Sequence, residues 1–233
     1  MGWILSGCRH RLTPRDFAFL QTILAADAEP EPWQRFFREE QALAEILDDE
    51  RLFRALGDHP FSLQISPQLY FYLLVRHFLR EAGIEDRDVA DFVAAVLADR
   101  IGSPAGAALT GIPGGWTHTT DFLALLSGAG EERRFEIYLA AGNQFLILTG
   151  LFPNYLRRRR DRAGAPGVRY YEGFARQAYQ ALGQHRLADP PTRQVLGRLV
   201  NSLTETRQSL NRMAENCLFL EDARDGSPSP PSS

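Results

Sequence analysis

The feature that most limits the fold of this chain is the helical spacing of its apolar residues. Five apolar residues lie at positions offset by three, four, seven and eight from the first of them: Val89, Phe92, Val93, Val96 and Leu97. This spacing puts all five on one face of an α-helix. Similar stripes recur along the chain, and no alternating strand pattern of useful length occurs. The sequence therefore predicts an all-α fold, a single bundle-like domain of about eight helices.

Local signals set the expected helix boundaries. Thr13-Pro14 and Ser66-Pro67 each join an N-cap residue to the residue favoured at the first helical position. A short run from Thr119 or Thr120 to Leu126 can also be helical. The main helices are expected at about 14–26, 33–57, 67–82, 89–97, 131–149, 153–164, 171–182 and 192–220.

The chain is expected to hold one folded domain. Its 233 residues suffice for one substantial core. We expect an N-terminal segment at 1–12, a helical domain at 13–220 and a disordered Ser/Pro-rich tail at 221–233. A long Gly/Pro-rich loop near 101–119 interrupts the domain. Loops of this length are usually lids, binding loops or connectors.

An apolar stretch in the middle of the chain, GNQFLILTGLFPNYLRRRR at 142–160, could suggest a membrane anchor. A spanning helix needs about 20 predominantly apolar residues. Here the run free of charged and amide groups covers only Phe145 to Pro153, so the sequence predicts no membrane span. The stretch is instead expected to be the buried centre of a helical bundle.

Polar groups inside this stretch are candidates for a binding site. A buried amide without a partner costs about 1–3 kcal/mol, so Asn143 and Gln144 need hydrogen-bond partners. A neighbouring helix can supply them, and so can a ligand held between helices. The hydroxyl groups of Tyr155, Tyr170 and Tyr171 can reach the same region.

Four consecutive arginines follow, from Arg157 to Arg160. Successive helical residues point about 100° apart, so these side chains surround the helix axis, which favours a solvated helix end. Arg157 and Arg160 can share a face and bind a phosphate or carboxylate. A nucleic-acid contact through Arg157–Arg162 is the least favoured alternative, because the formal net charge is -3.

Composition bears on the source and compartment. All 26 basic residues are arginine, a bias typical of a GC-rich bacterial genome. The two cysteines, Cys8 and Cys217, cannot form a disulfide framework, which favours a reducing cytoplasm. Only three apolar residues precede the small residues of MGWILSGC, too few for a secretory signal.

Most motifs of catalysis and metal binding are missing. No Walker or Rossmann glycine loop, no His-Glu-x-x-His pair and no Gly-x-Ser-x-Gly elbow occurs. His77 and Glu81 stand four apart on a predicted helix and could share a proton or a metal. Arg76 and Arg80 flank them, which is more typical of a salt-bridged helix flank. No metal site is predicted, and the sequence indicates no particular cofactor.

The segments GNQFLILTGLFPNYLRRR and YYEGFARQAY together resemble a block of uncharacterised bacterial all-helical proteins. The resemblance covers about 40 residues. It implies that 142–179 forms one structural unit, with the Tyr170-Tyr171 helix packed on the segment from Gly142 to Leu156. It implies no activity.

The expected function is therefore a broad one. The leading hypothesis is a cytoplasmic binding or regulatory module for a partner protein or an amphipathic small molecule. The alternative is an enzyme with a site between the 67–82 helix and the 140–179 unit. The heptad-like 192–220 helix could pack within its own bundle or form a homodimer seam.

Overall fold

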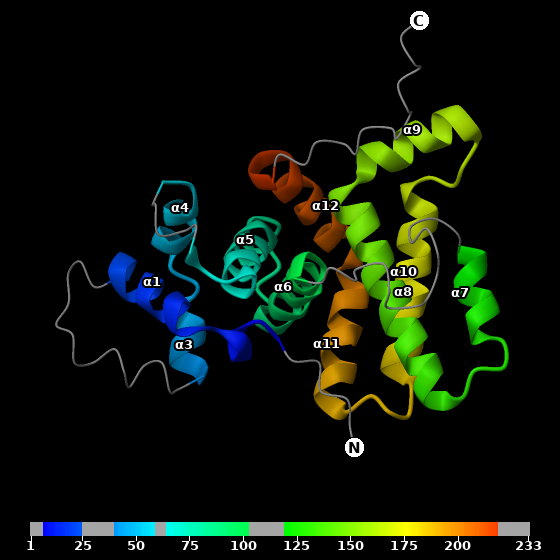
Figure 1. Cartoon of the computed structure of the whole chain (residues 1–233), viewed down its shortest axis with the longest axis horizontal. Coiled ribbons are helices and arrows are strands. Elements are labelled where there is room, and N and C mark those ends of the chain that lie inside the picture. Colours follow the sequence, from blue (N-terminus) through cyan, green and yellow to red (C-terminus); the bar gives the residue numbers. More distant parts are fainter. Residues whose placement is uncertain (1–6, 25–39, 59–63, 103–118, 219–233) are drawn as a thin grey trace, which may run out of the picture.

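The computed structural model describes residues 7–24, 40–58, 64–102 and 119–218. In these residues the fold is all-α and contains no strand. Helices α5 (Pro67–Glu81) and α6 (Arg87–Gly102) form a central antiparallel pair. Helices α1 (Pro14–Leu24), α3 (Glu40–Ile46) and α4 (Glu50–Asp58) lie on one side of this pair (Figure 1).

The remaining helices lie on the other side of the central pair (Figure 1). The long helix α8 (Glu131–Leu151) packs along α10 (Val168–Gln184), with α7 (Thr119–Leu126) at its edge. Helix α9 (Pro153–Ala163) bends away from α8 by 88°. Helices α11 (Pro190–Asn201) and α12 (Leu203–Met213) connect this group to α6 and α5, and a short π-helix, Ala214–Leu218, follows.

Both predicted N-caps are confirmed, and one buried carboxylate joins them. Ser66 Oγ accepts a hydrogen bond from the Leu69 amide of α5. Asp16, in the first turn of α1, accepts hydrogen bonds from the Ser66 amide at 2.7 Å and from the Thr13 amide at 2.6 Å. A carboxylate is favourable at the positive end of a helix dipole, so Asp16 fixes the starts of α1 and α5 to each other.

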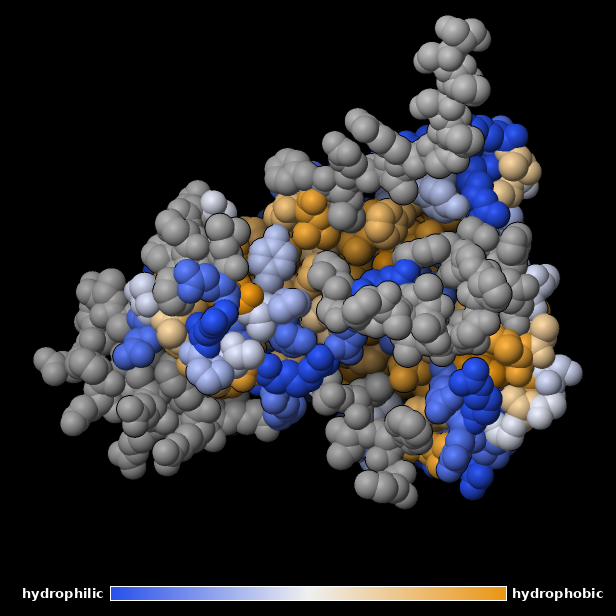
Figure 2. All heavy atoms as spheres, in the orientation of Figure 1, coloured by the Kyte–Doolittle hydropathy of each residue, from blue (hydrophilic) through white to orange (hydrophobic). Residues whose placement is uncertain are grey.

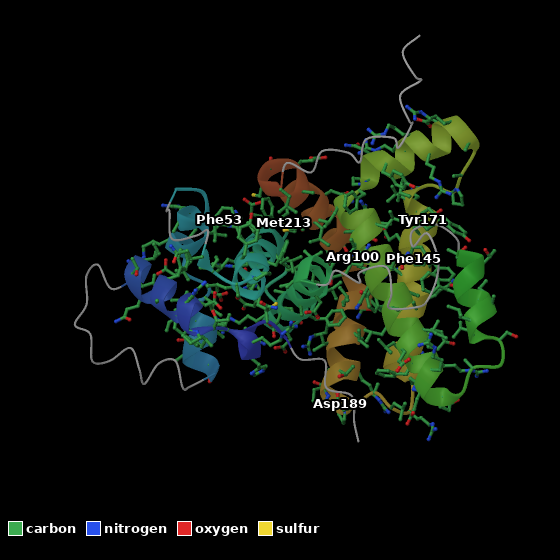
Figure 3. The ribbon with its side chains drawn as sticks, in the orientation of Figure 1. Phe53, Arg100, Phe145, Tyr171, Asp189 and Met213 are labelled. Atoms are coloured by element: carbon green, nitrogen blue, oxygen red, sulfur yellow. The ribbon has the colours of Figure 1, made fainter. Side chains whose placement is uncertain are left out.

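The predicted 142–179 unit is also confirmed. Gly142 of α8 faces the ring of Tyr179 on α10, and the Tyr179 hydroxyl donates a hydrogen bond to Asn143 Oδ1 at 3.0 Å. One turn further along α8, the ring of Phe145 stacks on the ring of Tyr171 of α10, with centroids 5.5 Å apart (Figure 3). Glycine leaves room for the Tyr179 ring at this point, and α8 and α10 form the most extensive helix–helix contact among the described residues.

The predicted helix at 192–220 differs from the structure. It is divided at Ser202 into α11 and α12, because the two halves cover different neighbours. Helix α11 packs on α6 and α10, whereas α12 packs on α5 and α8, and one straight helix cannot follow both directions. The apolar stripe is buried in this chain's own core: Leu196, Leu199, Leu203, Leu210 and Met213.

The apolar middle of the chain is interior, as expected. Phe145 to Gly150 are buried within α8. No single helix of the described residues is long and apolar enough to cross a membrane, and α8 meets that criterion only together with α9, across their bend. Figure 2 shows hydrophilic residues gathered at the free end of α9. The expected loop near 101–119 and the tail at 221–233 fall almost entirely outside the described residues, with helix ends at 101–102 and 119.

Two glycine positions test the close packing of α8 on α10. A methyl group at Gly142 would lie 2.6–2.9 Å from three ring carbons of Tyr179, whereas one at Gly173 of α10 meets nothing within 4 Å. We expect Gly142→Ala to lower the free energy of unfolding by about 1–3 kcal/mol through overpacking. Gly173→Ala should raise it by up to about 1 kcal/mol, since alanine is the better helix former.

Urea denaturation followed by circular dichroism measures both changes. Equal effects of the two substitutions would contradict the packing described for Gly142.

Candidate functional site

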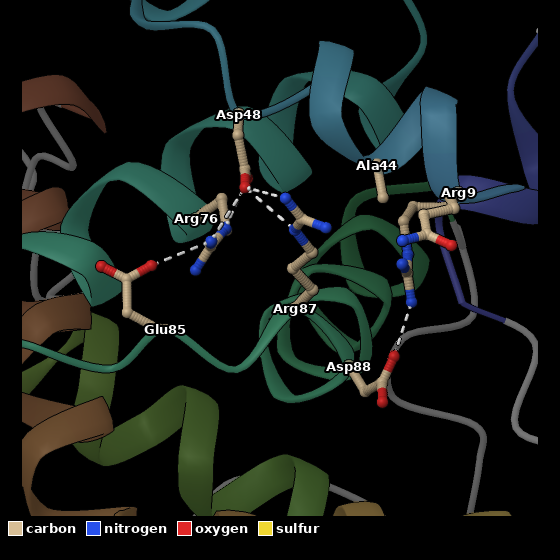
Figure 4. Close-up of a pocket in the computed structure, with 8 residues that line it drawn as sticks. Arg9, Ala44, Asp48, Arg76, Glu85, Arg87 and Asp88 are labelled. Atoms are coloured by element: carbon tan, nitrogen blue, oxygen red, sulfur yellow. Dashed lines mark hydrogen bonds and ion pairs between the residues drawn. The ribbon is translucent and has the colours of Figure 1, made fainter. Parts of the chain in front are cut away.

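A charged pocket opens where the first helices meet the central pair. It has a volume of about 620 Å³. Its walls come from the 3-10 turn Arg9–Arg11, from α3 and the turn after it, from α5, and from the turn that starts α6. The lining residues are Arg9, Gln41, Ala44, Asp48, Arg76, Glu85, Arg87 and Asp88 (Figure 4).

Asp48 is the central acceptor of this pocket. It stands in the short turn between α3 and α4, and its side chain is 16% exposed. Arg76 donates to it from Nε at 2.6 Å and from Nη2 at 3.0 Å. Arg87 donates from Nε at 2.9 Å. Burial disfavours ionisation of the carboxyl group, but these hydrogen bonds and charges outweigh it and hold the pKa of Asp48 below its ordinary value.

Arg76 explains why a carboxylate is needed at this turn. Its side chain lies on an otherwise buried face of α5 and is only 4% exposed. A buried charge is strongly destabilising unless it is paired. Besides Asp48, Arg76 Nη2 contacts Glu85 Oε2 at 3.1 Å. The flank of α5 is therefore salt-bridged, as the sequence indicated.

Arg9 enters the pocket from the opposite wall. Its Nη2 donates to Asp88 Oδ1 at 2.8 Å, and its backbone amide donates to Asp91 Oδ1 at 2.9 Å. The Arg9 side chain is 9% exposed. Its Nε is buried and lies 3.3 Å from Asp91 Oδ2, without a hydrogen bond. Arg9 is thus fixed in place by two carboxylates, and its donors are not all used.

Besides Arg9 Nε, two terminal guanidinium nitrogens of the pocket have no acceptor among the described residues. Asp48 engages Nε and Nη2 of Arg87, and no described residue accepts a hydrogen bond from Arg87 Nη1. The same holds for Arg9 Nη1 in the described part of the chain. In Figure 4 the unbonded nitrogen of Arg87 points toward Arg9 and Ala44. The pocket therefore has surplus donors between these two arginines.

A second pocket, of about 340 Å³, adjoins the first and shares Asp48, Arg76 and Glu85 with it. It contains both residues that the sequence singled out on α5. His77 Nε2 lies 3.4 Å from Glu81 Oε1. The His77 ring stacks on Phe53 of α4 with centroids 3.5 Å apart. Burial lowers the pKa of His77 and outweighs the opposing charges of Glu81 and Glu50.

The other candidate residues lie elsewhere. Asn143 pairs with Tyr179, and Gln144 is half-buried on the same helix. The Tyr170 hydroxyl pairs with Thr119 Oγ1 at 2.7 Å. Tyr171 is buried against Phe145, Tyr155 is half-buried, and Arg157 and Arg160 are exposed on α9.

These residues do not share a site with His77 and Glu81. His77 stacks on Phe53 of α4, whereas α12 packs on both α5 and α8 and lies between them. The structure therefore brings His77 and Glu81 together, but it separates them from the 140–179 unit.

Sequence analysis missed Arg9, Asp48 and Arg87. These three residues come from distant segments, and each alone is indistinguishable from an ordinary surface charge. One signal was present: Arg76 directly follows helical turns that are apolar all round, and a charge there requires a buried partner.

No group of three or more His, Cys, Asp or Glu side chains is placed to hold a metal ion within 7–24, 40–58, 64–102 and 119–218. Comparisons with protein-family models, with curated proteins and with solved structures find no match to this chain. The geometry of the site is therefore the basis for a functional proposal.

The dependence of this site on Asp48 can be tested by substitution. Asp48→Asn should lower the free energy of unfolding by on the order of 3 kcal/mol, because it leaves Arg76 buried beside a neutral amide. The Glu85 side chain is 67% exposed, so Glu85→Gln should lower the free energy of unfolding by less than about 1 kcal/mol.

The cost of Asp48→Asn should also depend on pH. The folded-state pKa of Asp48 is below its ordinary value of 3.8. Ionised Asp48 therefore contributes fully to the free energy of unfolding above pH 3.8, and this contribution is lost as the pH falls through the folded-state pKa. Urea unfolding at a series of pH values measures this difference. A difference that persists unchanged in acid would contradict the role given to Asp48.

Proposed function

We propose that this chain is a binding module for a small molecule with a carboxylate or phosphate group, held between Arg9 and Arg87. The observation that carries the proposal is the pair of Nη1 groups without acceptors among the described residues at this pocket. Guanidinium groups donate hydrogen bonds and accept none. A ligand that satisfies them must therefore bring acceptor oxygens, and oxyanions do so with the strongest hydrogen bonds.

Fixed positions of the two arginines support the proposal further. Asp48 holds the guanidinium of Arg87 at two nitrogens, and Asp88 and Asp91 hold Arg9. A ligand does not have to order these side chains on binding, which saves about 0.5–1.5 kcal/mol for each. The pocket is thus preorganised for an anion.

The chemistry of the lining favours binding over catalysis. Arginine does not exchange protons near neutral pH. Burial opposes the charge of Arg9, but Asp91 and Asp88 outweigh it and raise its pKa further. Asp48 is an ionised acceptor whose hydrogen bonds are already made. These groups can hold a ligand in place, whereas none of them is poised to transfer a proton.

The expected module was one for a partner protein or an amphipathic small molecule. The proposal replaces these with a small anion, held by arginines that the sequence did not single out. It assigns the module to a bacterial cytoplasm, as the composition and the two cysteines suggest. Cys8 and Cys217 are both free thiols here, which is compatible with a reducing compartment.

Binding of inorganic phosphate tests the proposal. Isothermal titration at neutral pH and low ionic strength should detect phosphate binding by the intact chain. Arg87→Met should weaken it about 10- to 100-fold, the equivalent of one charge-assisted hydrogen bond. Asp48 keeps Arg76 as a partner in this variant, so the fold should survive.

The matched control is Arg133→Met, which removes an exposed arginine that pairs with Glu136 on α8. It should bind phosphate as the unmodified chain does. Equal weakening by both substitutions, or no phosphate binding at all, would refute the proposed site.

A further inference from the structure

The two pockets, together called the groove, adjoin at a common wall. Asp48, Arg76 and Glu85 line both of them. The bridge between Arg76 and Glu85 marks the boundary, and Glu85 is largely exposed there. A ligand larger than a phosphate ion that lies over the exposed Glu85 side chain would contact both pockets.

The first pocket is lined by equal numbers of guanidinium and carboxylate groups, whereas carboxylates are in excess in the second. Two guanidinium groups line it, those of Arg76 and Arg80, against five carboxylates: Asp48, Asp49, Glu50, Glu81 and Glu85. Four of these carboxylates have guanidinium partners. Asp48 pairs with Arg76 and Arg87, Asp49 with Arg51, Glu50 with Arg54, and Glu85 with Arg76 and Arg80.

Glu81 is the exception among the described residues. Its one ionic neighbour is His77, 3.4 Å away. Burial, aided by the charge of Arg80, lowers the pKa of His77, so its imidazole is neutral at neutral pH. The charge of Glu81 is therefore not compensated by any described residue. The stacked rings of Phe53 and His77 lie beside it in the same pocket.

The groove thus has unused cationic donors at one end and an uncompensated carboxylate at the other. An ammonium group can pair with Glu81, whose side chain is 50% exposed. From this complementarity we infer that the ligand of the groove is a small zwitterion, with its oxyanion at Arg9 and Arg87 and its ammonium group at Glu81. The inference rests on the proposed function, because the oxyanion end is the site proposed there.

Paired synthetic probes test the ammonium end separately. One series consists of aminoalkylphosphonates of increasing chain length, and the other of alkylphosphonates of the same lengths without the amine. Titration calorimetry at neutral pH measures both. At the chain length that spans the groove, the amine should tighten binding about fivefold, as expected for a partly exposed ion pair.

Substitution of Glu81 tests whether this residue causes the increase in affinity that the amine gives. In Glu81→Gln the gain from the amine should disappear, while the affinity for the plain alkylphosphonate stays unchanged. Glu205→Gln, an exposed carboxylate on α12, should leave the gain intact. Arg87→Met should weaken both series together.

The outcomes separate the two proposals. If alkylphosphonates bind but no amine improves the affinity, or if the gain survives in Glu81→Gln, the zwitterion inference is overturned and the anion site stands. If neither series binds, the anion site itself is wrong, and the inference falls with it.

Discussion

The ion pair between Arg76 and Asp48 is the interaction on which the site depends. A guanidinium on the buried face of α5 requires an ionised partner, and the turn between α3 and α4 supplies it at 2.6 Å. That contact attaches the first helices to the central pair. It also orients Arg87, which shares the same carboxylate through two of its nitrogens. Nη1 of Arg87 then faces the pocket (Figure 4). The carboxylate that stabilises Arg76 thus also positions the donor proposed to bind the ligand.

The sequence predicted the helices well because local signals specify them. The caps at Thr13-Pro14 and Ser66-Pro67 and the stripe from Val89 to Leu97 depend on neighbours in the chain or on one helix face. The packing of 142–179 was instead implied by the resemblance of that block to other helical proteins. The division at Ser202 was missed because it depends on the directions of other helices. A regular spacing of leucines along 192–220 is the same whether they cover one neighbour or several.

The site was predicted only in part, for a related reason. His77 and Glu81 are one helical turn apart, and helical spacing alone brings them together. Arg9, Asp48 and Arg87 meet only through the tertiary fold, and a charged residue in a turn gives no sign of its partner. Asn143 indicated a polar group in need of a hydrogen bond, and the Tyr179 hydroxyl on the neighbouring helix provides it. Buried charges such as Arg76 are therefore the more useful guide to a site in a helical chain of this kind.

Nuclear magnetic resonance of the arginine side chains tests the central claim most directly. Each Nε–H group gives its own signal, so the titration of phosphate into the intact chain reports which guanidinium groups respond. The account predicts that the signals of Arg9 and Arg87 shift together and saturate at one phosphate concentration. Shifts confined to exposed arginines such as Arg157 and Arg160 on α9, with Arg9 and Arg87 unchanged, would contradict it.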